Sequence, residues 1–325
     1  MTDIPLRQAE LIHESDEPVG AEVRRVRGGW AAYGPSYRIL LFDADLRVRR
    51  RFPIPVRFRG TRYSWDVHPS GRWAVFSDTR HTTCVGPGGD TVWEADHPAL
   101  INVDGDPVVV CAFFHPTRDE LHVFPGMADN DTEVEDAGYE SARWTVSLPD
   151  LTVTKSEFSH SQDQWLIFPD GQYYGASGFD GHDVDGWCGL WDEGEDSDGV
   201  GRPLDVHPDR TTWLGNASGS LYMNPLRRPD AEYPQDEGDE DEVATDHDSY
   251  DEAFFLDRNL VLAATREPIT HELLDADNLQ LIARVAYPVA DQEWYWLAAT
   301  GDGTWTTTSR PPGGTTARLR HWRLA

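Results

Sequence analysis

A polar segment in the middle of the chain is the strongest candidate for a binding or catalytic site. Its members are Asp180, His182, Asp183, Asp185 and Trp187. Oxygen ligands at alternate positions with a glycine at the bend are typical of a calcium loop. In this pattern, however, Gly181 stands at the first ligand position, and Asp192 stands at the twelfth, where a bidentate Glu is needed. We therefore interpret the segment as an acidic turn, with a calcium site as the alternative.

Three histidines recur at one position of a repeated turn. His68, His115 and His207 each precede the proline or its equivalent in that turn. If their imidazoles converged, they could bind a transition metal. The alternative is that each ring bonds the turn backbone or packs between sheets, and Phe168 at the same place in a fourth copy favours this alternative. We expect no cofactor; the alternatives are calcium or a metal bound by histidines.

Local catalytic signatures are absent from the sequence. It has no GxSxG elbow, P-loop, GxGxxG or HExxH motif. Cys84, Cys111 and Cys188 are widely spaced and form no CxxC pair, so we expect neither a disulfide framework nor a zinc cluster. These observations favour a non-enzyme, although a site assembled from distant segments would leave no local motif.

The charge balance points to the class of partner. The chain of 325 residues has 57 acidic and 28 basic side chains, a net charge of -29. Binding to nucleic acid or to an anionic membrane begins with cationic neutralisation of phosphate, so both are disfavoured as main partners. A basic protein fits better. The first residues lack an apolar core typical of a signal peptide, and we expect a cytoplasmic protein.

Most of the acidic residues gather in three segments. These are residues 126–141, 178–201 and 229–252, and the last holds 12 Asp or Glu among 24 residues. Such a run either stays solvated without a specific role or attracts a basic partner. Residues 24–62 are the opposite case, with 11 of the 27 arginines against only Asp43 and Asp45. They indicate a charged sheet edge that resists pairing, a patch for an anion or partner, or an internal dock for an acidic segment.

A sequence repeat along the chain predicts the strands that position the candidate site residues and the charged segments. The clearest copy is HPSGRWAVFS (His68 to Ser77), and related copies have their anchor positions at residues 26, 69, 116, 169, 208, 256 and 301. The mean interval of about 46 residues is the size of a four-stranded propeller blade. Hairpins with Asp, Pro or Gly turns follow several copies, for example Arg38 to Phe52 and His271 to Val285. One slot per repeat holds a large side chain, which we expect to pack between sheets. These side chains are Trp30, Trp73, Leu121, Tyr173, Trp213, Leu260 and Trp305.

The stretches HPSGRWAVF, FPDGQYYGA and GDGTWTTT match the "sPDGrwiaf" pattern of propeller blades. On these motifs the chain resembles the WD40-like and TolB-like β-propeller superfamily. WD40 blades also repeat a Trp-Asp and a Gly-His pair, which this chain does not, so the resemblance is to the superfamily only. The last repeat supplies three strands, and the segment from Arg7 to Ser15 is predicted to complete it.

The sequence therefore predicts one all-β domain over residues 1–325, a monomeric seven-bladed propeller with four-stranded antiparallel blades. The three acidic segments are insertions in its loops. The predicted function is a binding scaffold that recognises a basic protein through an acidic face. Two alternatives remain: a hydrolase or lyase with its site at the channel mouth, and an inhibitor that mimics nucleic acid.

Overall fold

The computed structural model describes residues 4–20, 22–26, 28–101, 107–115, 117–125, 141–158, 162–167, 173–179, 185–190, 195–200, 202–209, 211–225, 243–245, 250–266, 269–289, 293–314 and 316–325. The chain forms two compact units. One contains Asp16–Gln164, and the other combines Met1–Ser15 with Trp165–Ala325. None of the helical residues described forms a segment long and apolar enough to cross a membrane.

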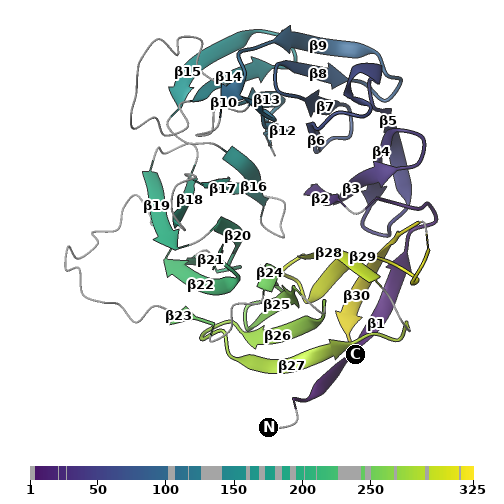
Figure 1. The fold of residues 1–325 in the computed structure, drawn as a ribbon, viewed down its shortest axis with the longest axis vertical. Helices are drawn as coiled ribbons and strands as arrows, with labels where there is room; N and C mark the ends of the chain where they lie inside the picture. The colour runs from purple at the N-terminus through teal and green to yellow at the C-terminus, as the bar shows by residue number, and fades with distance from the viewer. Residues whose placement is uncertain are drawn as a thin grey trace, which may run out of the picture. The chain divides into compact units, whose positions relative to one another are not determined.

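The Asp16–Gln164 unit is built from four-stranded antiparallel sheets, in which strands adjacent in sequence are also adjacent in space (Figure 1). The first sheet contains β2 (Val23–Val26), β3 (Gly29–Gly34), β4 (Arg38–Asp43) and β5 (Val48–Pro53), and the second contains β6 (Ser64–Val67), β7 (Ala74–Ser77), β8 (His81–Val85) and β9 (Thr91–Asp96). The third contains β12 (Ala112–Phe114), β13 (Glu120–Val123), β14 (Ser141–Ser147) and β15 (Val153–Phe158). A short 3-10 helix, η1 (Val56–Phe58), and a small hairpin of β10 (Leu100–Ile101) and β11 (Pro107–Val108) lie in the connections between sheets.

The other unit continues the same pattern. One sheet contains β16 (Gln162–Ile167), β17 (Tyr173–Phe179), β18 (Asp185–Leu190) and β19 (Glu195–Val200), and the next contains β20 (Arg202–Val206), β21 (Thr212–Ala217), β22 (Ser220–Pro225) and β23 (Val243–Ala244). An eight-stranded sheet contains β24 (Tyr250–Phe255), β25 (Leu260–Thr265), β26 (His271–Asp275), β27 (Leu281–Ala286), β1 (Leu6–Glu14), β30 (Arg318–Leu324), β29 (Thr304–Arg310) and β28 (Glu293–Ala299), in that spatial order.

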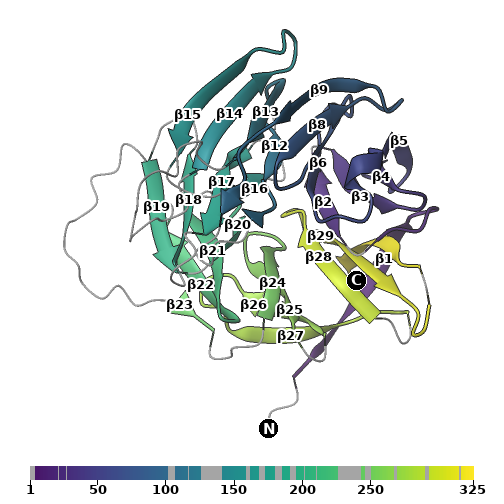
Figure 2. The ribbon, with the colours of Figure 1, turned by 45° about the horizontal axis from the view of Figure 1, so that its top comes forward.

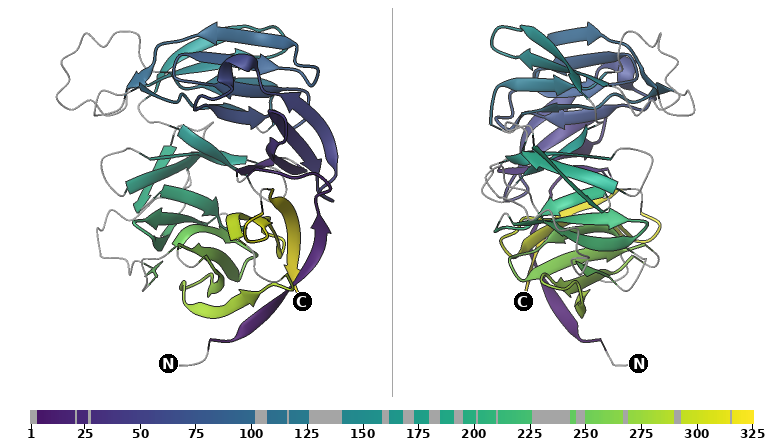
Figure 3. Two further views of the ribbon diagram at one scale, coloured as in Figure 1. Left: turned by 45° about the vertical axis from the view of Figure 1, so that its right-hand side comes forward. Right: turned by 90° about the vertical axis from the view of Figure 1, so that its left-hand side faces the viewer.

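The eight-stranded sheet consists of two antiparallel halves joined by the N-terminal strand. β1 pairs antiparallel with β30, from Ala9 opposite Leu324 to Glu14 opposite Arg320. It also pairs parallel with β27, where Leu6 lies opposite Arg284. Figures 2 and 3 show β1 running beside β30. The predicted completion of the last repeat by the N-terminal strand is therefore confirmed, while the count of seven blades stays a prediction.

The tight turns form where the sequence placed them, because their Asp side chains satisfy backbone N–H groups. Asp43 accepts hydrogen bonds from the N–H groups of Asp45 (3.1 Å) and Arg47 (2.9 Å). In the same kind of turn, Asp275 accepts from Asp277 (2.9 Å). Such side chains replace backbone partners in turns and fix the strand register on either side.

Apolar side chains pack between successive sheets. Clusters of buried residues join the first sheet to the second and the second to the third in the Asp16–Gln164 unit. Others join the β20–β23 sheet to β24–β27, and β24–β27 to β28–β30. Of the seven large side chains predicted for this role, Trp30, Leu121, Trp213 and Trp305 are buried, and Trp73 and Leu260 are partly buried. The side chain of Tyr173 lies outside the described residues. Burial against neighbouring sheets is thus the main source of cohesion.

Two linked hydrogen bonds are buried in the core of the Trp165–Ala325 unit. The indole N–H of Trp305 donates to the Tyr287 hydroxyl (3.0 Å), and that hydroxyl contacts Nδ1 of His271. Burial lowers the pKa of His271 to about 3, so this imidazole is neutral and Nδ1 can accept the Tyr287 proton. The two hydrogen bonds satisfy groups that would otherwise be buried without partners.

The depressed pKa of His271 predicts acid sensitivity. An unfolded histidine titrates near pH 6.5 and the folded one near 3, so the stability that comes from the neutral ring is complete above 6.5 and is lost as the pH falls. We expect the free energy of unfolding to fall by about 2 kcal/mol from this residue between pH 7 and 5. Urea denaturation at both pH values measures it. His271→Asn keeps an acceptor near Nδ1 but does not titrate, so it should lose correspondingly less. Equal losses in both proteins would contradict the assignment.

The buried cysteine Cys84 allows the packing of the Asp16–Gln164 unit to be tested. Its thiol is free and buried on β8, and burial raises its pKa to about 12. A thiol held protonated and away from solvent does not react as a nucleophile. We expect a thiol reagent at pH 8 to leave Cys84 unmodified in the folded protein and to label it in denaturant, as peptide mass mapping would show. Labelling of Cys84 at the same rate in both states would rule out this packing.

Candidate functional site

The polar segment favoured by the sequence lies mostly outside the described residues. This applies to Asp180, His182 and Asp183. Asp185 and Trp187 lie on β18, where Asp185 pairs with Val200 and Trp187 with Asp198 on β19, and the structure does not describe their side chains. The acidic-turn and calcium interpretations of this segment therefore both stay predictions.

The recurring histidines bond the backbone of their own turns. The N–H of Ser70 donates to Nδ1 of His68 (3.1 Å), and the N–H of Asp209 donates to Nδ1 of His207 (3.2 Å). His115 accepts in the same way from Thr117 (3.1 Å). Across the described part of the chain, no group of three or more His, Cys, Asp and Glu side chains is arranged to hold a metal ion. The geometry supports the turn-bonding interpretation of these histidines.

The other ring nitrogen of two of these histidines reaches the turn of the following sheet. Nε2 of His207 donates to the carbonyl oxygen of Arg258 (3.0 Å), in the turn between β24 and β25. Nε2 of His68 lies 3.3 Å from the carboxylate of Asp119, in the turn between β12 and β13. Burial lowers the pKa of His68 to about 4, so its ring is neutral at pH 7. The His207 ring therefore bonds the neighbouring turn, whereas the His68 ring lies against it without a hydrogen bond from Nε2.

An aspartate two residues earlier makes a second connection between the same sheets. Asp66 on β6 accepts the N–H of Phe114 on β12 (2.8 Å), and its other oxygen accepts the N–H of Val67 (2.8 Å). In the other unit, Asp205 on β20 accepts the N–H of Phe255 on β24 (2.9 Å). Burial raises the pKa of Asp66 to about 6, although Arg24 and the two N–H groups lower it, so the carboxylate is largely ionised at pH 7.

These aspartates were not singled out by sequence reasoning, yet a signal was present. Residues 66–69 and 205–208 both read Asp-Val-His-Pro, whereas the third histidine follows Phe-Phe. The Asp-Val-His-Pro motif thus occurs on β6 and β20, the first strands of two sheets, and in both its aspartate bonds the first strand of a neighbouring sheet. Glu252 on β24 makes a connection of the same kind outside this motif, because its carboxylate accepts the N–H of Leu297 on β28 (2.9 Å).

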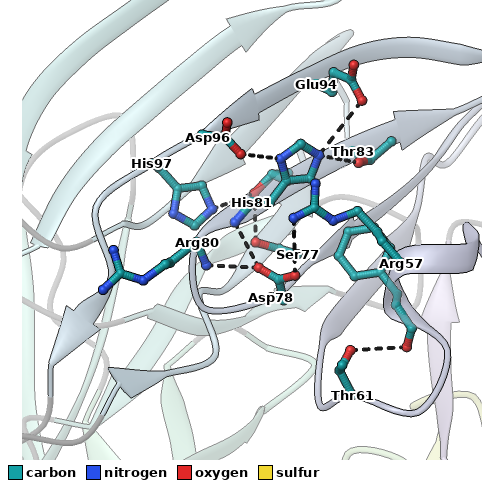
Figure 4. Close-up of polar contacts among 12 residues, drawn as sticks. Arg57, Thr61, Ser77, Asp78, Arg80, His81, Thr83, Glu94, Asp96 and His97 are labelled. Carbon is teal, nitrogen blue, oxygen red and sulfur yellow. Dashed lines mark hydrogen bonds and ion pairs between the residues drawn. The ribbon is translucent and has the colours of Figure 1, made fainter.

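A polar cluster at one end of the second sheet has the arrangement of a hydroxyl, a histidine and a carboxylate (Figure 4). His81 on β8 contacts Asp96 through Nδ1 (2.6 Å) and the hydroxyl of Thr83 through Nε2 (2.9 Å). The hydrogen bond with His81 lowers the pKa of Asp96. The order resembles that of a nucleophile, a base and an orienting acid. However, Thr83 is only 3% exposed, so its hydroxyl is not open to a substrate, and we interpret the three side chains as a connection between β8 and β9.

A second series of hydrogen bonds, through His97, Thr82 and Ser77, lies beside the His81 cluster. Nδ1 of His97 donates to the carbonyl oxygen of Pro98 (3.1 Å), which leaves Nε2 to accept the Thr82 hydroxyl (3.0 Å). Ser77 in turn bonds Thr82 (2.7 Å). Burial lowers the pKa of His97, which keeps the ring neutral and fixes the direction of these bonds. No local motif marks either set of hydrogen bonds, because their members meet through strand pairing, of Ser77 with Thr82 and of His81 with Asp96.

The structure changes the assignment of the third acidic segment. Residues 229–252 were predicted to be an insertion in a loop, but β23 lies within them and pairs with β22 as the fourth strand of its sheet. Residues 226–242 therefore connect the third and fourth strands, whereas residues 126–140 connect the second and third strands of another sheet, β13 and β14. In an antiparallel meander these two kinds of connection leave a sheet at opposite ends. The acidic segments do not all follow equivalent strands.

Comparison with known proteins identifies the fold. No protein-family model matches the chain, and no curated protein matches it. Among solved structures it is similar to the β-propeller domain of Cps50 (Swd1) from Myceliophteria thermophila, with a TM-score of 0.60 and 12% sequence identity. The match covers 98% of this chain and 100% of that domain. At this identity the likeness shows the fold alone, and the chain has the β-propeller fold.

Proposed function

We propose that this protein is a binding scaffold that recognises a basic protein through its acidic segments. The observation that carries the proposal is the segregation of charge. Residues 126–141, 178–201 and 229–252 hold 26 of the 57 acidic residues and none of the 28 basic ones. The rest of the chain has 31 acidic and 28 basic residues and is close to neutral. The net charge of -29 therefore belongs almost entirely to three segments.

The density of charge in these segments supports electrostatic recognition. Residues 229–252 have one acidic residue for every two positions on average. Even a fully extended chain advances only about 7 Å over two residues, which is less than the Debye length of about 8 Å at physiological ionic strength. Neighbouring carboxylates therefore reinforce one another instead of being screened individually. A partner with clustered Lys or Arg would gain in association rate and in selectivity.

The fold is consistent with this role. Propellers present loops on a framework of stacked sheets, so variation in the loops changes the partner without changing the core. The folded parts described here supply such a framework through the packed clusters and the hydrogen bonds of the Asp-Val-His-Pro motifs. Fold alone does not define a function, and the choice of partner rests on the charge.

A salt titration tests the proposal. A fluorescent peptide of about ten lysines is added to the full chain, and anisotropy is followed between about 50 and 200 mM salt. We expect binding that weakens steeply with salt, and no binding of an uncharged Gly-Ser peptide. In parallel, proteins retained from a native extract at low salt and released at high salt should be enriched in basic ones. Failure of the lysine peptide to bind at low salt would contradict the proposal.

A further inference from the structure

The Asp16–Gln164 unit carries an exposed basic surface of opposite sign to the chain as a whole. Residues 46–65 contain seven arginines and no Asp or Glu. Those that follow β5 lie in the connection from β5 to β6, around η1. We define the basic loop surface as Tyr37, Arg38, Val56, Arg57, Arg59 and Arg62, all of which are exposed.

The connection holds its shape through one buried anchor. Phe58 is fully buried, and its ring packs against Phe76, with centroids 5.9 Å apart, and Tyr63 (5.8 Å). Its N–H donates to the carbonyl oxygen of Pro55 (3.0 Å), while its own carbonyl oxygen accepts the Thr61 hydroxyl (3.2 Å). With Phe58 pointing inward, its neighbours Arg57 and Arg59 remain at the surface.

Arg59 is fixed in an orientation suited to a carboxylate. Its Nε donates to the carbonyl oxygen of Ile54 (3.1 Å), and its guanidinium lies over the Tyr37 ring, 5.1 Å from the centroid. Tyr37 is itself tied to this connection, because its carbonyl oxygen accepts the N–H of Ile54 (2.9 Å). With Nε occupied, the two terminal nitrogens remain to donate to one carboxylate together. Side chains ordered before binding lose less entropy on binding.

Acidic side chains near this surface are already engaged. Asp78 lies 3.8 Å from Arg57 and also accepts the N–H groups of Arg80 (2.9 Å) and His81 (2.8 Å). Asp96 and Glu94 contact His81, and Figure 4 shows them on the far side of its ring from Arg57. Within the described part of the chain, Arg38 and Arg62 make no ion pair, so the surface has donors for several carboxylates.

We propose that the basic loop surface binds an acidic peptide segment of a partner protein, with the Arg59 guanidinium receiving one of its carboxylates. Exposed apolar groups beside the arginines suit a peptide that also carries apolar side chains, since Val56 is 75% and Tyr37 is 58% exposed. A nucleic acid fits less well, because a long polyanion would extend into the field of a chain with a net charge of -29. This binding is separate from that of the acidic segments, so the scaffold would hold two partners of opposite charge.

The test compares two double variants with equal loss of charge in the same unit. Arg59→Gln/Arg62→Gln alters the basic loop surface. Arg47→Gln/Arg49→Gln alters exposed arginines at the beginning of β5, which is the opposite end of this strand from the connection to β6. The probe is a fluorescent peptide of about ten residues that alternates Glu with Leu, titrated into the full chain at about 100 mM salt. Circular dichroism and thermal melting confirm that each variant folds, as expected for substitutions at exposed sites.

We expect the wild-type chain to bind this probe, the loop variant to bind roughly tenfold more weakly, and the β5 variant to change by less than about twofold. Tyr37→Ala should weaken binding by a smaller factor, because it releases the Arg59 guanidinium without removing it. Absence of binding by the wild-type chain, or equal weakening in both double variants, would overturn the proposal. Tighter binding of a ten-nucleotide single-stranded DNA than of the peptide would assign the surface to nucleic acid instead. Since the lysine peptide reports on the acidic segments alone, the two proposals can fail independently.

Discussion

Replacement of Asp66 by alanine is expected to lower the free energy of unfolding by about 3 kcal/mol. The variant leaves two backbone N–H groups without their acceptor, those of Val67 and Phe114. Phe114 is buried, and a buried donor that loses its partner pays the full cost of desolvation. Urea denaturation followed by circular dichroism measures the change.

The isosteric variant Asp66→Asn makes the test more specific. Both oxygens of Asp66 accept an N–H, so an amide must turn its NH₂ group toward one of these donors. We expect it to lose about 1–2 kcal/mol despite its unchanged size. Asp150→Ala is the matched control, because Asp150 is an exposed turn residue whose bonds, to Ser147 and Thr152, stay within its own hairpin, and it should cost less than about 1 kcal/mol. If Asp66→Ala and Asp150→Ala had the same free energy of unfolding, the contact between β6 and β12 would contribute no measurable stability.

The same substitution at Asp205 asks whether the Asp-Val-His-Pro motif has one role in both units. Asp205 accepts the N–H of Phe255, which is also buried. A loss similar to that at Asp66 is expected. In both cases a carboxylate on the first strand of a sheet accepts the backbone N–H of a buried Phe on the first strand of another sheet. A loss at one site only would mean that the motif recurs without a common function.

Neutralisation of residues 229–252 is expected to weaken binding of the lysine peptide by roughly 100-fold at low salt. The variant changes ten of the 12 Asp and Glu residues of this segment to Asn and Gln, so chain length and side-chain shape are kept. Asp251 and Glu252 on β24 are left unchanged, because they bond Arg266 and Leu297. The salt dependence should become shallower at the same time, since fewer charges take part. Anisotropy titrations at about 50 and 200 mM salt measure both quantities.

The control exchanges Asp for Glu and Glu for Asp at the same ten positions. It conserves the 12 charges and should bind as the wild-type chain does, because the proposed attraction depends on charge density and not on the order of residues. If the neutral variant kept its affinity, the segment would be solvated surface, and the binding function would have to be sought elsewhere in the chain.

The amino-acid sequence was enough to predict the stacked four-stranded sheets of this protein. The repeat spacing predicted four-stranded sheets, the Asp turns at Asp43 and Asp275 predicted the hairpins, and the missing last strand predicted the pairing of β1 with β30. These features depend on local patterns: alternation of apolar residues, turn chemistry and the need to avoid a free edge. The short strand β23 escaped prediction because two residues within an acidic segment carry no such pattern.

The contacts between polar groups, in contrast, depend on how the sheets pack and could not be predicted from the sequence. Asp66 bonds Phe114 across 48 positions of the chain, and Arg59 lies over Tyr37 because both are tied to Ile54. His81 needs the register with Asp96 to complete its hydrogen bonds. A periodic pattern fixes which face of a strand is buried, but the partner of a buried polar atom is set by the packing of the next sheet. That packing brings together atoms that are remote in sequence to within about 3 Å.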